Sequence, residues 1–401
     1  MKRAFMVFFA LILVSVAATA FAAEPADVVE TGTGITVIKA ADWAEAYPDI
    51  YASYLKNEEN AEALDHVQEY PSIAVVYEGM AFNTYYASAR GHYYTVEDVT
   101  NTGRPHALAN CFTCKTPDFT VMVNNNGESA YTMPFEDMLA QVNESISCYN
   151  CHANDPSTIT VTHTYLVDAL GDDFTNVAAA TASCAQCHVE YYFDPATKAT
   201  TLPYSGLDTM SPDAIYEYYE SMGFTDYTNP RTGVQQIKVQ HPEFETYMGE
   251  GSVHKSMMGF TCADCHMGTA TNEQGESYTN HYWVSPLESE SIMANCSGCH
   301  ADLAAFVHGI QEHAEERTIA IGQKLESLTN ELATGIEATL FTDEELETIR
   351  ALNRKAQFYW DFVFVENSEG AHNSKLTESC LDKAEELVDE ALVLVRSKTA
   401  S

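Results

Sequence analysis

The sequence predicts a mainly α-helical fold with little sheet, closed by long helices at its C-terminal end. Three observations predict it. Residues 301–401 repeat apolar side chains at intervals of three and four, among many Ala, Leu, Glu and Lys residues. Residues 111–300 have little regular periodicity and are rich in Tyr, Phe, Gly, Asn and Thr. Ten of the eleven cysteines lie in five C-x-x-C pairs within that same stretch.

The chain begins like an exported protein. Residues 1–3 include two basic side chains, residues 4–16 are apolar, and Ala20-Phe21-Ala22 has the small-x-small form of a cleavage site. We expect residues 1–23 to be a signal peptide, cleaved near Ala22/Ala23, and the mature protein to reach a bacterial periplasm. No later apolar run reaches the length of a membrane span, so no direct span is expected.

Before the first cysteine, the sequence predicts one helical stretch in a mostly irregular chain. Residues 24–40 look extended, and residues 41–66 are acidic and helix-prone. Tyr70-Pro71 ends that pattern, because the residue before a proline disfavours helical backbone angles. A mixed apolar, Tyr-rich stretch then runs to Arg90-Gly91-His92.

The five C-x-x-C pairs have the form of haem-attachment motifs. In Cys-x-x-Cys-His, the two thiols bind the porphyrin covalently and the following residue ligates the iron. Zinc knuckles and disulfides do not require a histidine directly after the pair, so haem explains the pattern better. The sequence therefore predicts five covalently bound c-type haems, a multihaem cytochrome c fold, and a haem-wrapped core in place of regular helices. The attachment residues are Cys111, Cys114, Lys115, Cys148, Cys151, His152, Cys184, Cys187, His188, Cys262, Cys265, His266, Cys296, Cys299 and His300.

One attachment motif differs from the other four, because Lys115 stands where they carry histidine. A lysine amine, with an ordinary pKa of about 10.4, must lose its proton to bind iron. We expect the Lys115 haem to be the reaction site and the other four haems to deliver electrons. The eleventh cysteine, Cys380, has no partner and is expected to be a buried small residue.

The four motif histidines fill one axial position each, so four more ligands are needed to close the opposite faces of those haems. Ten further histidines are available, and their positions alone do not choose among them. They are His66, His92, His106, His163, His241, His254, His281, His308, His313 and His372.

Three helices are expected after residue 300, over residues 301–335, 342–365 and 377–398. Thr342 and Glu345 form a capping-box pattern at the start of the second. These helices carry no attachment motif and are expected to form a homodimer interface; the alternative is packing against the haem region. We expect residues 24–300 to form a pentahaem catalytic region and residues 301–401 a C-terminal helical region, together in one structural unit.

The net charge of -38 narrows the range of partners. Such an acidic surface argues against nucleic acid and against anionic lipid. It suits an electron donor with a basic docking patch, and it equally suits simple solubility.

With these motifs in view, the chain resembles the catalytic subunit of the ammonia-forming pentahaem cytochrome c nitrite reductases over nearly its whole mature length. A single C-x-x-C-K before four C-x-x-C-H motifs is specific to that family. The other similar blocks are Arg90-Gly91-His92, the ten residues from Cys184 to Phe193, Lys238-Val239-Gln240-His241-Pro242-Glu243, and Glu366-Asn367-Ser368 followed by Gly370-Ala371-His372-Asn373.

The resemblance implies specific roles for these residues. Lys115 would ligate the first haem, whose other face would be open. The implied axial pairs are His152 with His281, His188 with His92, His266 with His372, and His300 with His254. The implied catalytic residues are Arg104, Tyr191 and His241. One calcium ion would be held by Glu190, Gln240 and the backbone carbonyls of Tyr191 and Lys238, and such oxygen ligands suit a hard cation.

The activity implied is the six-electron reduction of nitrite to ammonium in the periplasm. The implied electron donor is a multihaem membrane quinol oxidase or a periplasmic cytochrome. The alternative is a periplasmic electron-transfer cytochrome without its own substrate, which would need every iron closed, for example by His106 on the first haem. Hydroxylamine or sulfite as preferred substrate is a further alternative.

Overall fold

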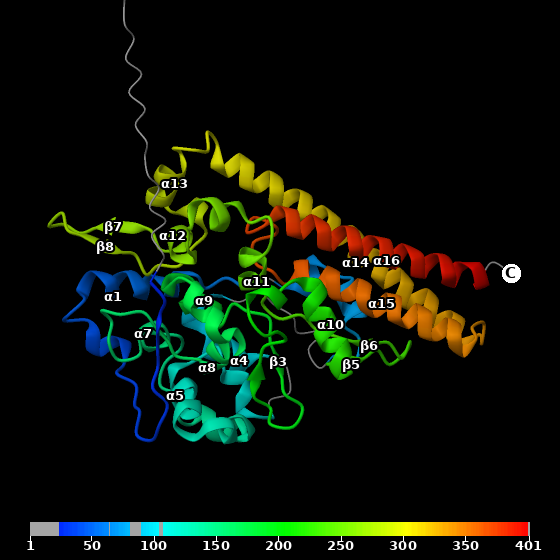
Figure 1. The fold of residues 1–401 in the computed structure, drawn as a ribbon, viewed down its shortest axis with the longest axis horizontal. Helices are drawn as coiled ribbons and strands as arrows, with labels where there is room; N and C mark the ends of the chain where they lie inside the picture. The colour runs from blue at the N-terminus through cyan, green and yellow to red at the C-terminus, as the bar shows by residue number, and fades with distance from the viewer. Residues whose placement is uncertain (1–23, 64, 81–89, 104–106, 400–401) are drawn as a thin grey trace, which may run out of the picture.

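The computed structural model describes residues 24–399 except 64, 81–89 and 104–106, so the expected signal peptide, Arg104 and His106 lie outside the described residues. Its helices are short before residue 300 and long after it (Figure 1). The short helices are α1 Pro48–Leu55, α2 His66–Glu69, α3 Ile73–Val76, α4 Thr95–Asn101, α5 Pro117–Asn126, α6 Phe135–Leu139, α7 Cys148–His152, α8 Thr164–Leu170, α9 Ala179–Ala185, α10 Pro212–Met222, α11 Glu243–Met248, α12 Cys262–His266 and α13 Glu290–Cys296.

The strands are only two or three residues long and form two-stranded sheets. The first pair is parallel and the other three pairs are antiparallel. The strands are β1 Asp27–Val28 with β2 Thr160–Val161, β3 Tyr192–Phe193 with β4 Thr200–Thr201, β5 Tyr227–Thr228 with β6 Gln235–Gln236, and β7 Thr269–Thr271 with β8 Ser277–Thr279. The expected mainly α fold with little sheet is therefore confirmed.

The helix-prone stretch 41–66 is more broken than its composition suggests. Its one regular helix, α1, begins at Pro48, because a proline has no N–H to lose in the first helical turn. Turns of 3-10 helix flank α1 on both sides. The expected break at Tyr70-Pro71 is present, since α2 ends at Glu69.

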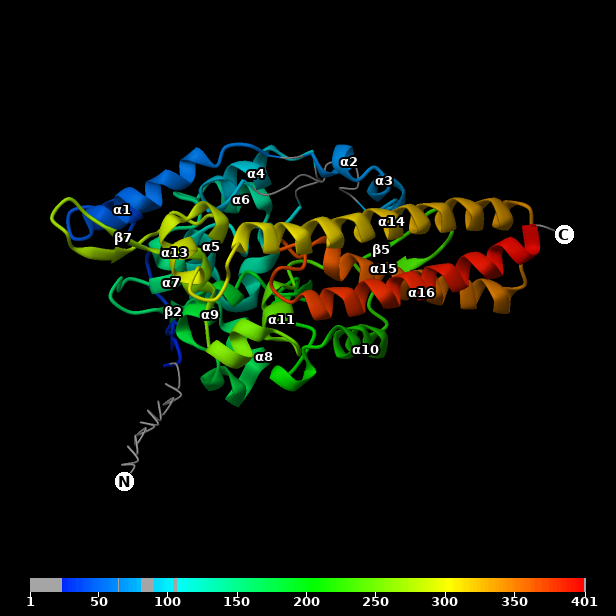
Figure 2. The same cartoon turned by 90° about the horizontal axis from the view of Figure 1, so that it is seen from above.

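Three long helices close the chain: α14 Leu303–Glu337, α15 Asp343–Phe364 and α16 Ser374–Thr399. Asp302 caps α14 by accepting a hydrogen bond from the backbone N–H of Ala305 at 3.0 Å. The expected capping box of α15 is present, with Thr342 and Glu345 bonded reciprocally. The three helices lie side by side and extend beyond the rest of the protein on one side (Figures 1 and 2).

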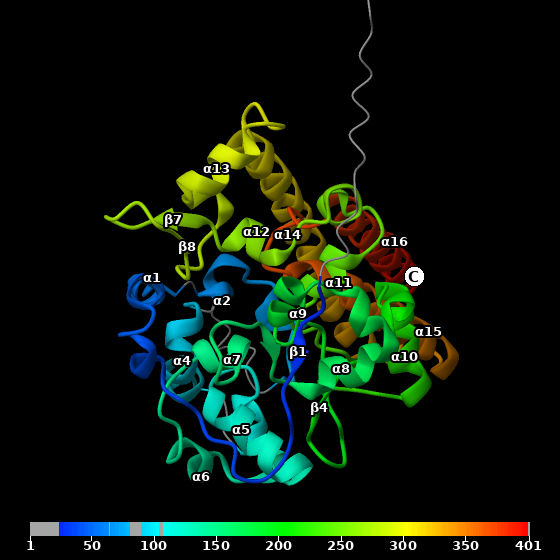
Figure 3. The ribbon, with the colours of Figure 1, turned by 60° about the vertical axis from the view of Figure 1, so that its left-hand side comes forward.

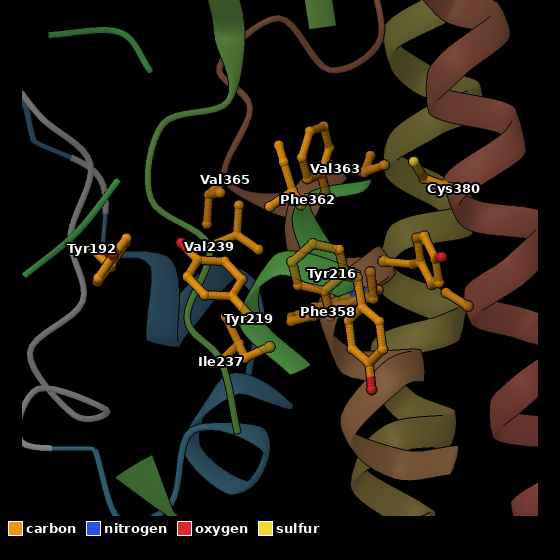
Figure 4. Close-up of a cluster of buried hydrophobic side chains, with 14 of the residues drawn as sticks. Tyr192, Tyr216, Tyr219, Ile237, Val239, Phe358, Phe362, Val363, Val365 and Cys380 are labelled. Atoms are coloured by element: carbon orange, nitrogen blue, oxygen red, sulfur yellow. The ribbon is translucent and has the colours of Figure 1, made fainter. Parts of the chain in front are cut away.

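The main hydrophobic core joins the long helices to the haem-motif region. Tyr216 and Tyr219 of α10, Val239, and Phe358 and Phe362 of α15 are buried together (Figure 4). A second, smaller cluster surrounds the first attachment motif, where the rings of Phe112 and Phe135 stack 4.5 Å apart. Cys380 is 2% exposed within the main core, which confirms the expected buried small residue. Among the described helices, none is long and apolar enough to cross a membrane.

Candidate haem cluster and substrate site

Two of the five attachment motifs, in α7 and α12, form single turns of helix with their own caps, and the other three begin in a 3-10 turn or at the end of a helix and continue beyond it. Ser147 forms a capping box with Asn150 at the start of α7, and Thr261 forms one with Asp264 at the start of α12. A capped turn places the two thiols of C-x-x-C and the following histidine on one side of the backbone. None of the described cysteines is in a disulfide.

The attachment motifs are neighbours in space, and the third motif lies next to the first, the second and the fourth. Helix α9 packs against both α7 and α12 (Figure 3). The thiols that link neighbouring motifs lie close enough for their charges to interact. These thiol pairs are Cys114 with Cys187, Cys151 with Cys184, Cys184 with Cys262, and Cys265 with Cys296. Groups attached at these positions would therefore form a connected series.

The structure brings the eight expected axial histidines together in the four expected pairs. Their ring centroids are 6.3 Å apart for His152 and His281, 6.0 Å for His92 and His188, 6.1 Å for His266 and His372, and 6.0 Å for His254 and His300. Two imidazoles on opposite sides of one metal ion, each with a metal–nitrogen bond of about 2 Å, have ring centroids about 6 Å apart. Each pair therefore fits a single iron between its rings.

The partners of the Nδ1 atoms show which ring nitrogen is left for iron. Nδ1 lies 2.6 Å from the carbonyl of Thr158 in His152, 3.0 Å from that of Thr279 in His281, and 3.2 Å from that of Val284 in His266. Such bonds fix the tautomer and the ring orientation of a ligating histidine. In these three residues Nε2 is the nitrogen available to the iron.

His188 has two imidazole neighbours, because His241 lies 6.4 Å from it, nearly as close as His92. The carboxylate of Glu243 faces both His188 and His241. Its Oε1 lies 3.7 Å from Nδ1 of His188 and 3.9 Å from Nδ1 of His241, which are electrostatic contacts longer than a hydrogen bond. Both rings turn Nδ1 toward Glu243, so their Nε2 atoms are directed elsewhere.

Lys115 is half-buried beside these histidines. Its backbone N–H donates to Phe112 at 3.0 Å, and its carbonyl accepts from the hydroxyl of Thr95 at 2.7 Å. Burial is the main cause that lowers the pKa of His92 and of His241. The positive charge of the nearby Lys115 amine lowers both pKa values further.

The expected catalytic residues Tyr191 and His241 lie on segments that one buried hydrogen bond joins. The backbone N–H of Gln240 donates to Oε2 of Glu190 at 2.6 Å, and Tyr191 and His241 are the next residues along. The side chain of His241 is 42% exposed as a whole, whereas its Nδ1, which faces Glu243, is buried. Arg104, the third expected member, lies outside the described residues.

The expected calcium ligands lie together around Glu190, whose carboxylate is fully buried. Oε1 of Glu190 accepts from the hydroxyl of Tyr219 at 2.8 Å, and the side chain of Gln240 donates to the carbonyl of Lys238 at 2.9 Å. Burial raises the pKa of Glu190 well above its usual range, and the nearby carboxylate of Glu245 raises it further. A divalent cation bound to this carboxylate and these oxygens would remove that penalty.

Further carboxylates make the calcium region strongly acidic. The backbone N–H of Glu190 donates to both oxygens of Glu245 at 3.1 and 3.2 Å, and burial raises the pKa of Glu245 to about 8. Burial also raises the pKa of Asp226 to about 6. The charge of Lys238 offsets part of the rise at Asp226, and its amine bonds both oxygens of Asp361 at 3.0 and 3.1 Å.

Four residues that support the site were not expected from the sequence. Three are the buried acids Glu243, Glu366 and Asp361, and the fourth is Tyr219, which donates a hydrogen bond to Glu190. Glu243 and Glu366 lie inside the blocks that carry the family resemblance, within six residues of a ligand or catalytic histidine. Carboxylates at such positions could have been noted as partners for Nδ1. Asp361 in α15 and Tyr219 in α10 lie far in sequence from the attachment motifs, and no sequence pattern marks them as part of the site.

The family model for cytochrome c552 matches residues 39–401, so the chain belongs to the cytochrome c552 family. Its structure is similar to that of cytochrome c nitrite reductase from Desulfovibrio desulfuricans ATCC 27774, with a TM-score of 0.80 and 26% sequence identity over 90% of this chain and 86% of that one. That structure is described with two calcium sites in the catalytic subunit. The resemblance drawn from the sequence is confirmed by these two matches.

Two larger cytochromes show weaker similarity. The outer cell wall cytochrome OcwA has a TM-score of 0.41 at 20% identity, over 74% of this chain and 48% of that one. An undecahaem S-layer cytochrome of Carboxydothermus ferrireducens has a TM-score of 0.40 at 16% identity, over 76% of this chain and 41% of that one.

Proposed function

We propose that the chain is a periplasmic cytochrome c nitrite reductase that converts nitrite to ammonium at a haem carried by Cys111 and Cys114 and ligated by Lys115. The observation that carries this proposal is the contrast among the five motifs. Each motif that ends in histidine faces a second imidazole at a distance that suits one iron. The motif that ends in lysine instead has the Tyr191 and His241 segments beside it.

Nitrite takes up six electrons and eight protons to become ammonium and two waters. The proposed external donor would supply the six electrons, and the covalently bound haems, when present, would pass them on one at a time. A single iron changes its charge by too little to hold them all, so the four histidine-paired positions are proposed as a relay to the Lys115 position. The connected series of attachment turns supports this arrangement.

The side chains around the substrate would supply protons and hold charge. Glu243 faces Nδ1 of His241, so Nε2 would face the substrate and would pass a proton to nitrite when the imidazole is doubly protonated. The hydroxyl of Tyr191 is a neutral hydrogen-bond donor for partly reduced species. By resemblance, Arg104 would stabilise the nitrite oxygens electrostatically, as positioned cationic donors do for developing negative charge.

We also propose one calcium ion, bound by Glu190, by Gln240, and by the carbonyls of Tyr191 and Lys238. The four residues adjoin or include the segments that carry the catalytic side chains. Gln240 would turn its amide so that the oxygen faces the ion. The calcium ion would fix the positions of Tyr191 and His241 and would not take part in the chemistry.

The remaining proposals concern the setting of the enzyme. Export by a signal peptide of residues 1–23 follows from the sequence pattern. A homodimer through residues 301–401 is supported by the three helices that extend beyond the haem region, where Val393 is 68% exposed (Figure 2). The proposed electron donor is a multihaem membrane quinol oxidase or a periplasmic cytochrome with a basic docking surface.

The test is an assay of purified holoprotein with nitrite and a reduced viologen, in which ammonium is measured directly. The proposal requires one ammonium per nitrite consumed, and intact mass should show five haems on the same sample. Nitrite consumption without ammonium, or none at all, would favour the electron-transfer cytochrome. Ratios of kcat/KM for nitrite, hydroxylamine and sulfite would settle the preferred substrate.

A further inference from the structure

The paired histidines differ in what lies behind their Nδ1 atoms. His152, His281 and His266 face neutral backbone carbonyls. Among the paired histidines in the described chain, His372 has the shortest contact with a carboxylate, with Nδ1 2.5 Å from Oε1 of Glu366, whereas the carboxylate of Glu243 lies 3.7 Å from Nδ1 of His188. The haem position between His266 and His372 is therefore backed by a negative charge on one side.

Glu366 is fixed in this position by its surroundings. Its side chain is 3% exposed. Its second oxygen accepts from the hydroxyl of Ser368 at 2.6 Å, and that hydroxyl accepts from the backbone N–H of His372 at 2.9 Å. The three residues thus form a closed set of hydrogen bonds around the ligand.

The charge of Glu366 has no cationic side chain near it, within the described residues, other than the imidazole that it contacts. Among the described residues, no lysine or arginine lies within ion-pair distance of it, and its one ion-pair contact is His372. Its negative charge therefore acts on the imidazole and on whatever that imidazole ligates, in a poorly solvated setting where charges interact strongly.

We propose that Glu366 lowers the reduction potential of the haem held by His266 and His372. A hydrogen bond from Nδ1 to a carboxylate increases the electron donation of the imidazole, and outer hydrogen bonds of this kind tune a bound metal. Both this donation and the nearby negative charge stabilise the ferric state over the ferrous state. The step affected is the transfer of one electron from a neighbouring reduced haem, which converts Fe(III) to Fe(II) without breaking a bond.

The position of this haem gives the lowered potential a consequence. Its thiols Cys262 and Cys265 adjoin Cys184 on one side and Cys296 on the other. A low-potential centre between two others holds an electron only briefly. Glu366 thereby limits electron exchange between the Cys296/Cys299 haem and the rest of the relay. The inference rests on the proposed function only in that this position holds a haem.

The test compares Glu366→Gln with Glu369→Gln in the holoprotein. Glu369 lies three residues away, is exposed, and has no hydrogen bond to His372 in the described structure. Glu366→Gln should raise the equilibrium constant for reducing one haem about tenfold, the lower end of the usual effect of such partners. For one electron this corresponds to about 59 mV. Glu369→Gln should leave all potentials close to wild type.

The readout is a potentiometric titration followed by EPR, which separates the low-spin haems by their g values. A rise confined to one low-spin haem supports the inference. Five unchanged potentials in fully loaded Glu366→Gln, or equal shifts in both variants, would overturn it. If Glu366→Gln does not mature, Ser368→Ala removes the hydroxyl that holds the carboxylate and should raise the same single potential; no shift there overturns the inference equally. Wild-type protein with five haems but no nitrite reduction would refute the proposed function and leave this test intact.

Discussion

At the scale of single residues, the axial histidines are defined by the atoms behind them. An imidazole whose Nδ1 is bonded to the protein presents Nε2 to a metal with its ring already oriented. His152, His266, His281 and His372 all have such a partner. Lys115 has no second nitrogen to anchor, so its place in the motif turn and its half-buried stem must orient it.

Lys115→His tests whether the lysine serves the chemistry. The variant has the ordinary Cys-x-x-Cys-His motif, so all five haems should be attached. Only the axial donor at the reaction site changes, from an amine to an imidazole, and axial-ligand identity is a main determinant of haem reactivity. We expect kcat for ammonium formation to fall by more than about tenfold. Haem count by mass and turnover should be measured on one sample.

Lys383→His is the matched control, since Lys383 pairs with Asp213 near the surface and far along the chain from any motif. It should retain wild-type turnover. If Lys115→His carried five haems and turned over like Lys383→His, the lysine would have no chemical role.

At the scale of elements, helix α15 holds the segment that carries His241 and the proposed calcium ligands Lys238 and Gln240. Asp361 accepts from the backbone N–H of Val239 at 2.8 Å and pairs with the buried amine of Lys238. Tyr77 and Gln357 also donate to Asp361. One buried carboxylate therefore fixes residues 238–239 through both backbone and side chain.

Asp361→Asn should destabilise the protein strongly, because it leaves the Lys238 amine buried without an opposite charge. Breaking such a pair costs about 3–5 kcal/mol. We expect a large drop in Tm and weaker calcium binding, since the Lys238 carbonyl loses its support. Glu331→Gln removes a half-buried partner of the exposed Arg396 and should cost less than about 1 kcal/mol. Similar Tm values for the two variants would contradict this account of Asp361.

Removing calcium should have a distinct effect at Glu190. In wild-type holoprotein, a chelator leaves that buried carboxylate without its cation, so Tm and turnover should both fall. An ion present at about a hundred times its Kd contributes about 2.7 kcal/mol of stability. Glu190→Gln is neutral and retains the hydrogen-bonding shape, so its Tm should not respond to chelator. Unchanged wild-type Tm and turnover, with metal analysis showing the ion gone, would exclude the proposed role.

At the scale of the whole molecule, the features that could be predicted from the sequence are those encoded by residues close together in the chain. The attachment turns, the long C-terminal helices and the capping box at Thr342 are each encoded within a few residues or by a regular period. His152 and His281 are far apart in sequence, so their pairing cannot be predicted from the spacing of residues. It was predicted from the family resemblance. The Lys238–Asp361 pair joins two distant elements in the same way.

The acidic surface and the haem series set how the whole enzyme would meet its partners. A net charge of -38 repels nitrite at long range, and salt screens such fields beyond about 10 Å at 0.1 M. Arg104, His241 and the iron would have to attract nitrite locally. Nitrite would therefore be attracted at the Lys115 haem position, which is expected to have an open face. The other four haem positions are expected to have none.

The most direct measurement is an EPR titration of oxidised wild-type holoprotein with nitrite. One of the five haems should give a high-spin ferric signal that is lost as nitrite binds, because Lys115 leaves one face of that iron open. The other four should give low-spin signals that nitrite does not change, because two imidazoles close each of them. Five low-spin haems without nitrite, or a high-spin signal that nitrite leaves unchanged, would contradict the assignment of the lysine haem as the reaction site.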